Sequence, residues 1–162
     1  LVGSEMCIRD RNNPGLWVTG DSVILGIRFE LDSRQPIGLI NARVGRQATE
    51  LLEVITNDKA NMSMATIVLN MGNNNKLTEE QVAAIFEEIK DQPRIVVVNT
   101  AVPRAWRDEN NALIAQYASL YGAFLVDWAS ISQGRSEYFG SDGVHLVPAG
   151  VRAYVDAITA QL

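Results

Sequence analysis

The sequence has very little of two side chains that carry much of protein chemistry. Its 162 residues include one histidine, His145, and one cysteine, Cys7. A single cysteine makes no internal disulfide, so the redox compartment stays open. One histidine and one cysteine also do not supply a zinc ligand set, so no metal site is expected. Any chemistry that needs an imidazole must use His145.

Long apolar runs and clusters of positive charge are also missing. No apolar run approaches the ~20 residues that a membrane-spanning helix needs. The net charge is −5 and no Lys/Arg run stands out, so a nucleic-acid partner is not expected. Neither a Gly-x-Gly-x-x-Gly nor a P-loop pattern occurs, so we expect no nucleotide cofactor. The length and the 47% of hydrophobic residues favour one globular domain with a real core.

Five short apolar runs alternate with segments of helical periodicity. The runs predict buried strands over residues 16–19, 37–41, 65–70, 94–99 and 123–127. The helical faces between them comprise Ala48, Leu51, Leu52 and Ile55; Val82, Ile85, Phe86 and Ile89; Leu113, Ile114, Tyr117, Leu120 and Tyr121; and Val151, Tyr154, Val155, Ile158 and Leu162. A shorter helix is predicted over 22–29, and a capping box at 78–81. This alternation indicates a parallel sheet with helices on both faces.

The turn Gly20-Asp21-Ser22 directly follows the first predicted strand. A strand that turns into a helix here presents the serine hydroxyl at the rim of the sheet. The start of the helix adds free N–H groups and partial positive charge, which favour an oxyanion beside the hydroxyl. In the plainer interpretation, Asp21 or Ser22 merely caps the helix.

Asp142 lies three residues before His145, so one turn of chain can present both to the same pocket. A serine needs a base to become a nucleophile at neutral pH, and imidazole is the usual one. A carboxylate on one ring nitrogen fixes the tautomer and leaves the other nitrogen to take the serine proton. The alternative is a surface histidine beside an aspartate in a polar loop.

Two residues that follow other predicted strands are candidates for an oxyanion hole. Gly45 lets a backbone N–H approach a substrate closely. Asn74 offers an uncharged amide donor, a kind of group that stabilises such transition states by several kcal/mol. We expect the Asn74 amide to donate to the oxyanion and not to local loop structure. Alternatively, Gly45 only makes a tight turn and Asn74 is an ordinary residue of an Asn-rich loop.

In order and spacing these segments resemble the SGNH/GDSL hydrolase superfamily, which is named for its Ser, Gly, Asn and His blocks. The matching residues are Ser22, Gly45, Asn74 and the pair Asp142-x-x-His145. The resemblance covers nearly all of residues 16–162. It implies a flavodoxin-like three-layer α/β/α sandwich with a five-stranded parallel sheet, and cofactor-free ester or acyl-transfer chemistry. The third block departs from the pattern, because Gly-Asn-Asn-Asn replaces the more usual Gly-Thr-Asn-Gly.

A narrower resemblance is to the extracytoplasmic domain of peptidoglycan O-acetyltransferases. It rests on segments 20–26 (GDSVILG), 44–47 (VGRQ), 102–106 (VPRAW) and 141–146 (SDGVHL). In those proteins the domain follows a multi-spanning acyltransferase-3 membrane domain. The resemblance implies a location on the cell-surface side of a bacterial membrane, a small acyl ester as donor and a polysaccharide as acceptor. It also implies a membrane acyltransferase, fused or separate, as partner.

Four residues beside these segments are candidates for holding a sugar or the acyl donor: Arg46, Gln47, Arg104 and Trp106. A structural role is the alternative for two of them. Arg104 would then pair with a helix carboxylate, and Trp106 would cover the edge of the sheet.

The first eleven residues show neither a strand nor a helix period and resemble translated sequencing-adapter read-through. A natural disordered N-terminus is the alternative. We therefore expect a non-native or disordered leader over 1–11 and an SGNH hydrolase-type catalytic domain over 12–162.

The expected function is a serine esterase or O-acetyltransferase that acts on acetyl esters of cell-wall polysaccharide through an acyl-Ser22 intermediate. Hydrolase and transferase share every catalytic residue, so the sequence does not separate them. A stand-alone carbohydrate or lipid esterase of the same superfamily is one alternative. A non-catalytic flavodoxin-like binding domain is the other.

Overall fold

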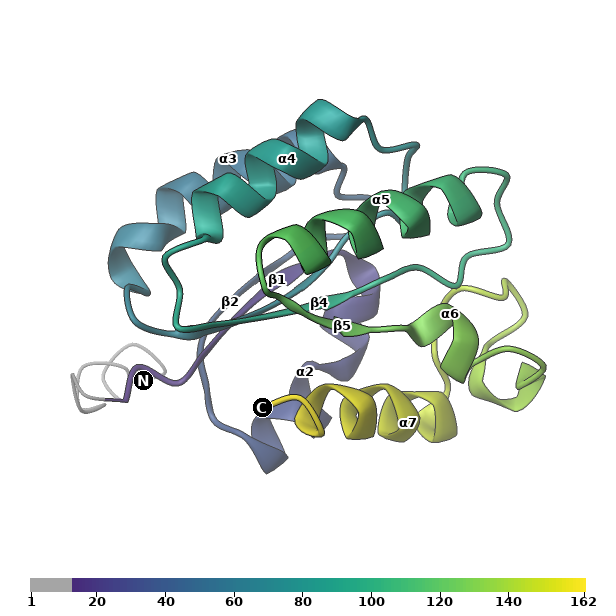
Figure 1. The fold of residues 1–162 in the computed structure, drawn as a ribbon. Coiled ribbons are helices and arrows are strands. Elements are labelled where there is room, and N and C mark those ends of the chain that lie inside the picture. The colour runs from purple at the N-terminus through teal and green to yellow at the C-terminus, as the bar shows by residue number, and fades with distance from the viewer. Residues whose placement is uncertain (1–12) are drawn as a thin grey trace.

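The computed structural model describes residues 13–162, so the leader expected over 1–11 lies outside the described residues. A sheet of five parallel strands lies between two layers of helices (Figure 1). The strands are β1 (Leu16–Gly20), β2 (Ile37–Ala42), β3 (Thr66–Asn70), β4 (Arg94–Val98) and β5 (Phe124–Val126). Their order, β2-β1-β3-β4-β5, is the flavodoxin-like one. The predicted three-layer α/β/α sandwich is confirmed.

The two helical layers differ in size. Helices α2 (Ser22–Arg34) and α7 (Pro148–Thr159) cover one face of the sheet, as Figure 1 shows. The other face is covered by α3 (Ala48–Asp58), α4 (Glu79–Ile89) and α5 (Arg107–Leu120). Short helical segments complete the chain: η1 (Lys59–Asn61), α6 (Trp128–Ile131) and η2 (Ser136–Tyr138).

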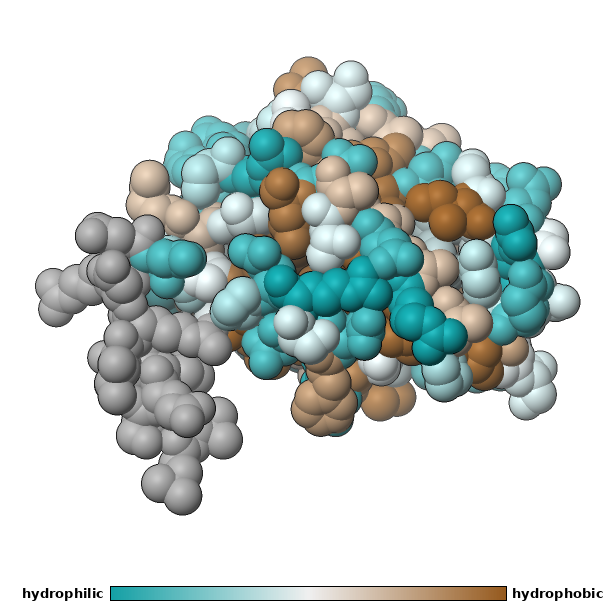
Figure 2. Space-filling model, turned by 90° about the horizontal axis from the view of Figure 1, so that it is seen from below, coloured by the Kyte–Doolittle hydropathy of each residue, from teal (hydrophilic) through white to brown (hydrophobic). Residues whose placement is uncertain are grey.

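Each layer has its own hydrophobic core, and the central strands contribute to both. Ile67 and Leu69 of β3 belong to the core beneath α3, α4 and α5, whereas Val68 belongs to the core beneath α2 and α7. Side chains alternate between the faces of a strand, so a continuous apolar run is what a sheet covered on both faces requires. Figure 2 shows the outer face of the α2–α7 layer, where hydrophilic and hydrophobic residues are interspersed without an extended hydrophobic patch.

All four strand pairings are parallel, so the carboxyl ends of the strands lie along one edge of the sheet. Thr19 of β1 is in register with Asn41 of β2 and Leu69 of β3. The loops that follow these three strands therefore begin side by side. Sheets of this kind bind their ligands at that edge, and the predicted site residues follow these strands.

The starts of two helices depend on specific side chains. The predicted capping box is confirmed: Gln81 N–H donates to Thr78 Oγ1 at 3.2 Å, and Thr78 N–H donates to Gln81 Oε1 at 3.1 Å. At the start of α2, Asp21 accepts a hydrogen bond from Val23 N–H at 2.9 Å. The cap makes Ser22 the first residue of the helix.

Two details of the helices differ from prediction. Helix α2 continues past residue 29 to Arg34, because Ile27 and Leu31 extend its buried stripe. Leu120 was expected on the buried face of α5 but is 71% exposed. The buried residues of α5 include Ala118, and a residue two positions further along lies about 200° round the helix. None of the helices in the described part of the chain has the length and apolar character needed to cross a bilayer.

Candidate active site

A serine, a histidine and an aspartate are linked by hydrogen bonds at the carboxyl edge of the sheet. The Oγ of Ser22 lies 3.0 Å from Nε2 of His145, although 123 residues separate them in the sequence. The Nδ1 of His145 lies 2.5 Å from Oδ2 of Asp142. This arrangement has the geometry of a nucleophile, a general base and the carboxylate that orients the base.

The loop that carries the histidine is held by its own backbone. Oδ1 of Asp142 accepts hydrogen bonds from the N–H groups of Val144 at 2.9 Å and His145 at 3.0 Å. Between them Gly143 has a φ of +69°, a conformation that favours glycine. Hydrogen bonds from the His145 ring and from these two N–H groups hold the pKa of Asp142 well below its usual range. Asp142 therefore stays ionised while a histidine titrates.

On the other side of Ser22, a buried carboxylate connects two of the predicted blocks. Asp21 is 3% exposed. Its Oδ2 accepts hydrogen bonds from the side-chain amides of Asn73 at 2.8 Å and Asn74 at 3.1 Å. Burial raises the pKa of Asp21, and the hydrogen bonds from Val23 and Asn73 oppose that shift. The loop after β3 is thus tied to the residue that precedes the serine.

The three consecutive asparagines of this loop have different surroundings. Asn73 is buried, and its amide also donates to Oδ1 of Asn70 at 2.8 Å. Asn74 is half-buried, and its amide also donates to the carbonyl oxygen of Arg46 at 3.1 Å. The amide of Asn75 donates to the carbonyl of the next residue, Lys76. We expected the Asn74 amide to be free of local loop structure, and in this structure both of its bonds go to protein acceptors.

Gly45 lies in an exposed turn between β2 and α3 and has a φ of +74°. A residue with a side chain would be strained in this conformation, although no atom would obstruct its Cβ. The N–H of Arg46 donates to the Arg43 carbonyl at 3.3 Å, which closes the turn. The N–H of Arg43 donates in turn to the carbonyl of Gly20 at 3.3 Å, which attaches the turn to the end of β1.

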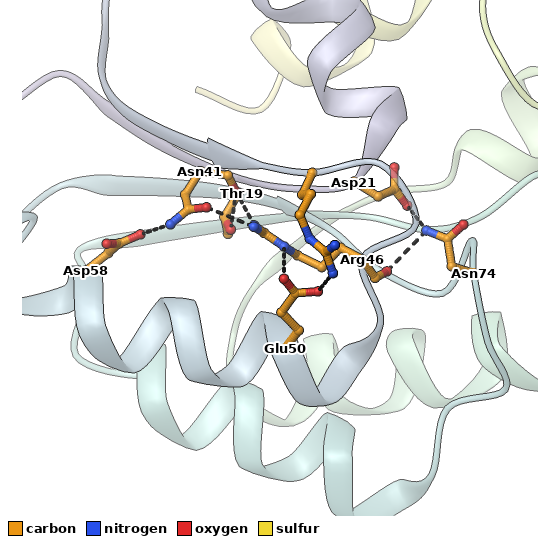
Figure 3. Close-up of polar contacts among 8 residues, drawn as sticks. Thr19, Asp21, Asn41, Arg46, Glu50, Asp58 and Asn74 are labelled. Atoms are coloured by element: carbon orange, nitrogen blue, oxygen red, sulfur yellow. Dashed lines mark hydrogen bonds and ion pairs between the residues drawn. The ribbon is translucent and has the colours of Figure 1, made fainter.

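The four predicted substrate contacts have different surroundings. The guanidinium of Arg46 is buried and donates hydrogen bonds to Asn41 (Figure 3). It points into the protein, whereas the predicted substrate contact needs an exposed group. Gln47 is exposed just before α3, and Arg104 is exposed with its Nη1 3.2 Å from the Pro103 carbonyl. Trp106 is half-buried. Its indole N–H has no hydrogen-bond partner among the described residues.

A polar groove of about 430 Å³ lies between the start of α5 and the α6 segment. Arg107, Asp108, Ser130 and Gln133 contribute polar side chains to it, and Phe139 an aromatic ring. Ala101 and Phe139 also line a small cavity that extends to Val23 and Val144, the neighbours of Ser22 and His145. The groove therefore meets a cavity that is lined by sequence neighbours of Ser22 and His145. This groove was not predicted from the sequence, because its residues lie in no recognised block.

The described residues, 13–162, contain no group of three or more His, Cys, Asp or Glu side chains arranged to hold a metal ion.

No protein-family model matches the chain. The chain is 39% identical to peptidoglycan O-acetyltransferase OatA of Listeria monocytogenes over 142 residues, which are 87% of this chain and 23% of that protein. The chain thus spans about a quarter of the length of the curated relatives it matches.

Solved structures show the same fold. The C-terminal catalytic domain of peptidoglycan O-acetyltransferase A from Streptococcus pneumoniae has a TM-score of 0.72 and 23% identity, and the match covers 91% of this chain and 92% of that one. A GDSL-like lipase from Bacteroides thetaiotaomicron has a TM-score of 0.74 and 18% identity, over 98% of this chain and 93% of that one.

The fold is therefore shared with these proteins, and at its carboxyl edge the site has the Ser–His–Asp geometry of a serine nucleophile with its base. In sequence the chain is similar to one domain of peptidoglycan O-acetyltransferases, and in fold to the catalytic domain of one of them and to a GDSL-like lipase.

Proposed function

We propose that residues 12–162 form the catalytic domain of a serine esterase or O-acetyltransferase that acts on acetyl esters of cell-wall polysaccharide. The observation that carries the proposal is the alignment of Ser22, His145 and Asp142 at the carboxyl edge of the sheet. The choice of polysaccharide is supported by the relatives, which are named peptidoglycan O-acetyltransferases.

In the first half of the proposed reaction, Ser22 Oγ attacks the carbonyl carbon of the acetyl ester. The Nε2 of His145 takes the hydroxyl proton, and Asp142 stabilises the resulting imidazolium through Nδ1–H. The tetrahedral intermediate carries an oxyanion, for which the donors are the backbone N–H groups of Ser22 and Gly45 and the Asn74 amide. Collapse of the intermediate breaks the ester C–O bond. The departing alcohol takes the proton from His145, and acetyl-Ser22 remains.

For Asn74 to serve in this way, its amide must exchange one of its two present acceptors for the oxyanion. The bond to the Arg46 carbonyl and the bond to the Asp21 carboxylate are both 3.1 Å long. A hydrogen bond to the neutral carbonyl is weaker than one to the charged carboxylate, so we expect the bond to the Arg46 carbonyl to break. Asn74 would then remain attached to Asp21 while one N–H turns to the intermediate.

In the second half, an acceptor hydroxyl loses its proton to His145 and attacks the carbonyl carbon of acetyl-Ser22. Collapse of the resulting intermediate breaks the bond to Ser22 Oγ, which takes the proton back from His145, and the acetylated acceptor leaves. The acceptor is a sugar hydroxyl in a transferase and water in a hydrolase. We propose that the polysaccharide lies along the polar groove that contains Arg107, Ser130 and Gln133. Its hydrogen-bonding side chains suit the hydroxyls of a sugar, and Phe139 presents an aromatic ring at the catalytic end. This reaction would take place on the extracytoplasmic side of a bacterial membrane, supplied by a membrane acyltransferase that is fused to this domain or separate from it.

Two experiments test the proposal. A fluorophosphonate should label the wild-type protein at Ser22 and leave Ser22→Ala unlabelled, and wild-type protein that resists labelling would indicate a binding domain. Acetyl transfer from an activated ester to a chito-oligosaccharide, measured against acetate release into water, should then separate transferase from esterase. Release of acetate without any acetylated oligosaccharide would contradict the transferase.

A further inference from the structure

The side chain of Arg46 is held inside the protein next to the proposed oxyanion hole. It is 5% exposed. Its Nη1 donates to the backbone carbonyl of Asn41 at 2.6 Å, and its Nη2 donates to Oδ1 of the same residue at 2.9 Å. Nε lies 3.9 Å from Oε1 of Glu50. Figure 3 shows the guanidinium between the end of β2 and helix α3.

The residue that accepts these bonds is itself fixed. The Asn41 amide donates to Oδ2 of Asp58, at the end of α3, at 2.7 Å. The Asn41 carbonyl also accepts a hydrogen bond from the Thr19 hydroxyl at 2.9 Å. Asn41 is therefore tied to β1 and α3 as well as to its own strand, and it gives the guanidinium a rigid anchor (Figure 3).

The backbone of Arg46 reaches both of the proposed oxyanion donors that lie outside α2. Its N–H closes the turn that contains Gly45, and its carbonyl accepts from the Asn74 amide at 3.1 Å. Any rotation of residue 46 would thus move the Gly45 peptide and release Asn74. Oxyanion donors are effective only when they are fixed before the reaction, because reorganising them costs part of the stabilisation that they provide.

Burying the charged guanidinium at this position costs free energy, because the group loses its hydration. Burial lowers the pKa of Arg46, and the charge of Glu50 opposes that shift. Nε has no hydrogen-bond partner among the described residues. Both Nη atoms donate to Asn41, and with the side chain 5% exposed little of the guanidinium is open to a substrate group. The contacts therefore favour a role inside the protein over the substrate contact expected from the sequence.

We propose that Arg46 is a positioning residue for the oxyanion hole: its bonds to Asn41 hold the Gly45 turn in place, and its carbonyl holds the Asn74 amide at the site until the oxyanion takes over that bond. The inference rests on the proposed function, because it needs an oxyanion to form at Ser22. It assigns Arg46 no contact with the substrate.

The test compares two arginines of the same loop in the full chain. Arg46→Lys keeps the positive charge but cannot donate to both Asn41 oxygens as the planar guanidinium does. We expect kcat for a small acetyl ester, per titrated Ser22, to fall by about 10–100-fold with KM within about twofold. The control is Arg43→Ala. Arg43 is exposed and paired with Glu50, so its removal should change kcat by less than about threefold.

A second readout separates positioning from a general structural role. Methylboronic acid forms a tetrahedral adduct with an active serine, so its inhibition constant should rise in Arg46→Lys by the same factor as kcat falls. The variant Asn41→Ala removes one anchor oxygen and should show the same pattern with a smaller effect. An unchanged kcat in both variants, or a rise in KM alone, would overturn the inference.

Failure of the proposed function would look different. Wild-type protein without turnover would exclude the esterase itself, whereas active wild type with fully active Arg46→Lys would exclude only the positioning role. If both variants lose the fold by circular dichroism while Arg43→Ala keeps it, Arg46 is a folding residue and the positioning role is also overturned.

Discussion

The two sides of the serine are built in different ways. On one side, the buried Asp21 carboxylate accepts hydrogen bonds from Asn73 and Asn74, and buried Arg46 accepts one from Asn74 through its backbone carbonyl. On the other, the side chains of His145 and Asp142 are 55% and 48% exposed and are held by a turn of their own loop. The contrast follows the two tasks of the site. Donors that stabilise charge must be fixed in advance, whereas a proton carrier must reach substrate and solvent.

The two aspartates show the same contrast in their electrostatics. Burial raises the pKa of Asp21, while hydrogen bonds lower that of Asp142. The first carboxylate loses hydration inside the protein, and the second gains donors at the surface. Mutations on the buried side should therefore affect folding and catalysis together, and mutations on the exposed side should affect catalysis alone.

The largest effect is expected where the two sides meet. Ser22→Ala should lower turnover of a small acetyl ester by on the order of 10⁵-fold or more, because no acyl-enzyme forms. The melting temperature should stay close to that of the wild type, since the helix cap Asp21 remains. Turnover and calorimetry on the same preparation measure both. A folded Ser22→Ala protein with substantial activity would show that Ser22 is not the nucleophile.

On the exposed side, Asp142→Asn should lower kcat by on the order of 10⁴-fold, because the asparagine no longer stabilises the imidazolium or fixes its tautomer. The asparagine Oδ1 can still accept from the Val144 and His145 N–H groups, so the loop should persist. The melting temperature should fall only slightly, because the carboxylate lies at the surface. A large loss of stability would show that the exposed side also supports the fold, and would break the comparison.

On the buried side, Asn73→Ala and Asn74→Ala should separate folding from catalysis. Asn74→Ala should lower kcat by about 100-fold or more, since one oxyanion donor is worth ~3 kcal/mol. Asn73→Ala should instead lower the free energy of unfolding by about 1–3 kcal/mol, because it leaves Asp21 and Asn70 short of a buried donor. Denaturation curves and single-ester kinetics on both variants would check this, and Asn75→Ala is the matched control. The reverse assignment would mean that our register for this block is wrong by one residue.

The smallest effect is the pH dependence of the wild type. The rate should fall as the pH is lowered from neutral into the acidic range, because the base must be neutral. A carboxylate whose pKa is lowered in the folded state stabilises the fold fully at pH values above its unfolded-state pKa. This stability is lost as the pH falls from there through the folded-state pKa. Asp142 therefore stays ionised over this range, and stability from this group should be constant while activity falls. An activity profile flat between pH 5 and 8 would contradict His145 as the base.

Much of this fold was predictable because local signals agreed with each other. Continuous β-branched runs such as Ile95–Val98 fit only buried strands, and the Thr78 capping box marked the start of α4. The order and spacing of the motifs indicated Ser22, Asp142 and His145 as site residues, and the structure places them in contact.

What escaped prediction depends on contacts between distant segments. The position of Arg46 next to Gly45 indicates a substrate contact, because a charged side chain beside a predicted site usually faces solvent. Its actual direction is decided by Asn41 and, behind it, by Asp58, which the sequence does not connect to it. Likewise, one bond of the Asn74 amide goes to the Asp21 carboxylate, which the motif alone describes only as a helix cap, and the other goes to the Arg46 carbonyl.

Ser22 is the first residue of α2, and His145 lies just before the start of α7. These two helices lie on the same face of the sheet and share one core, in which Ile24 and Ile27 of α2 accompany Tyr154 and Ile158 of α7. The distance between nucleophile and base is therefore fixed by how two helices pack. Natural selection for a fast enzyme must act on these interior side chains as well, although none of them meets a substrate.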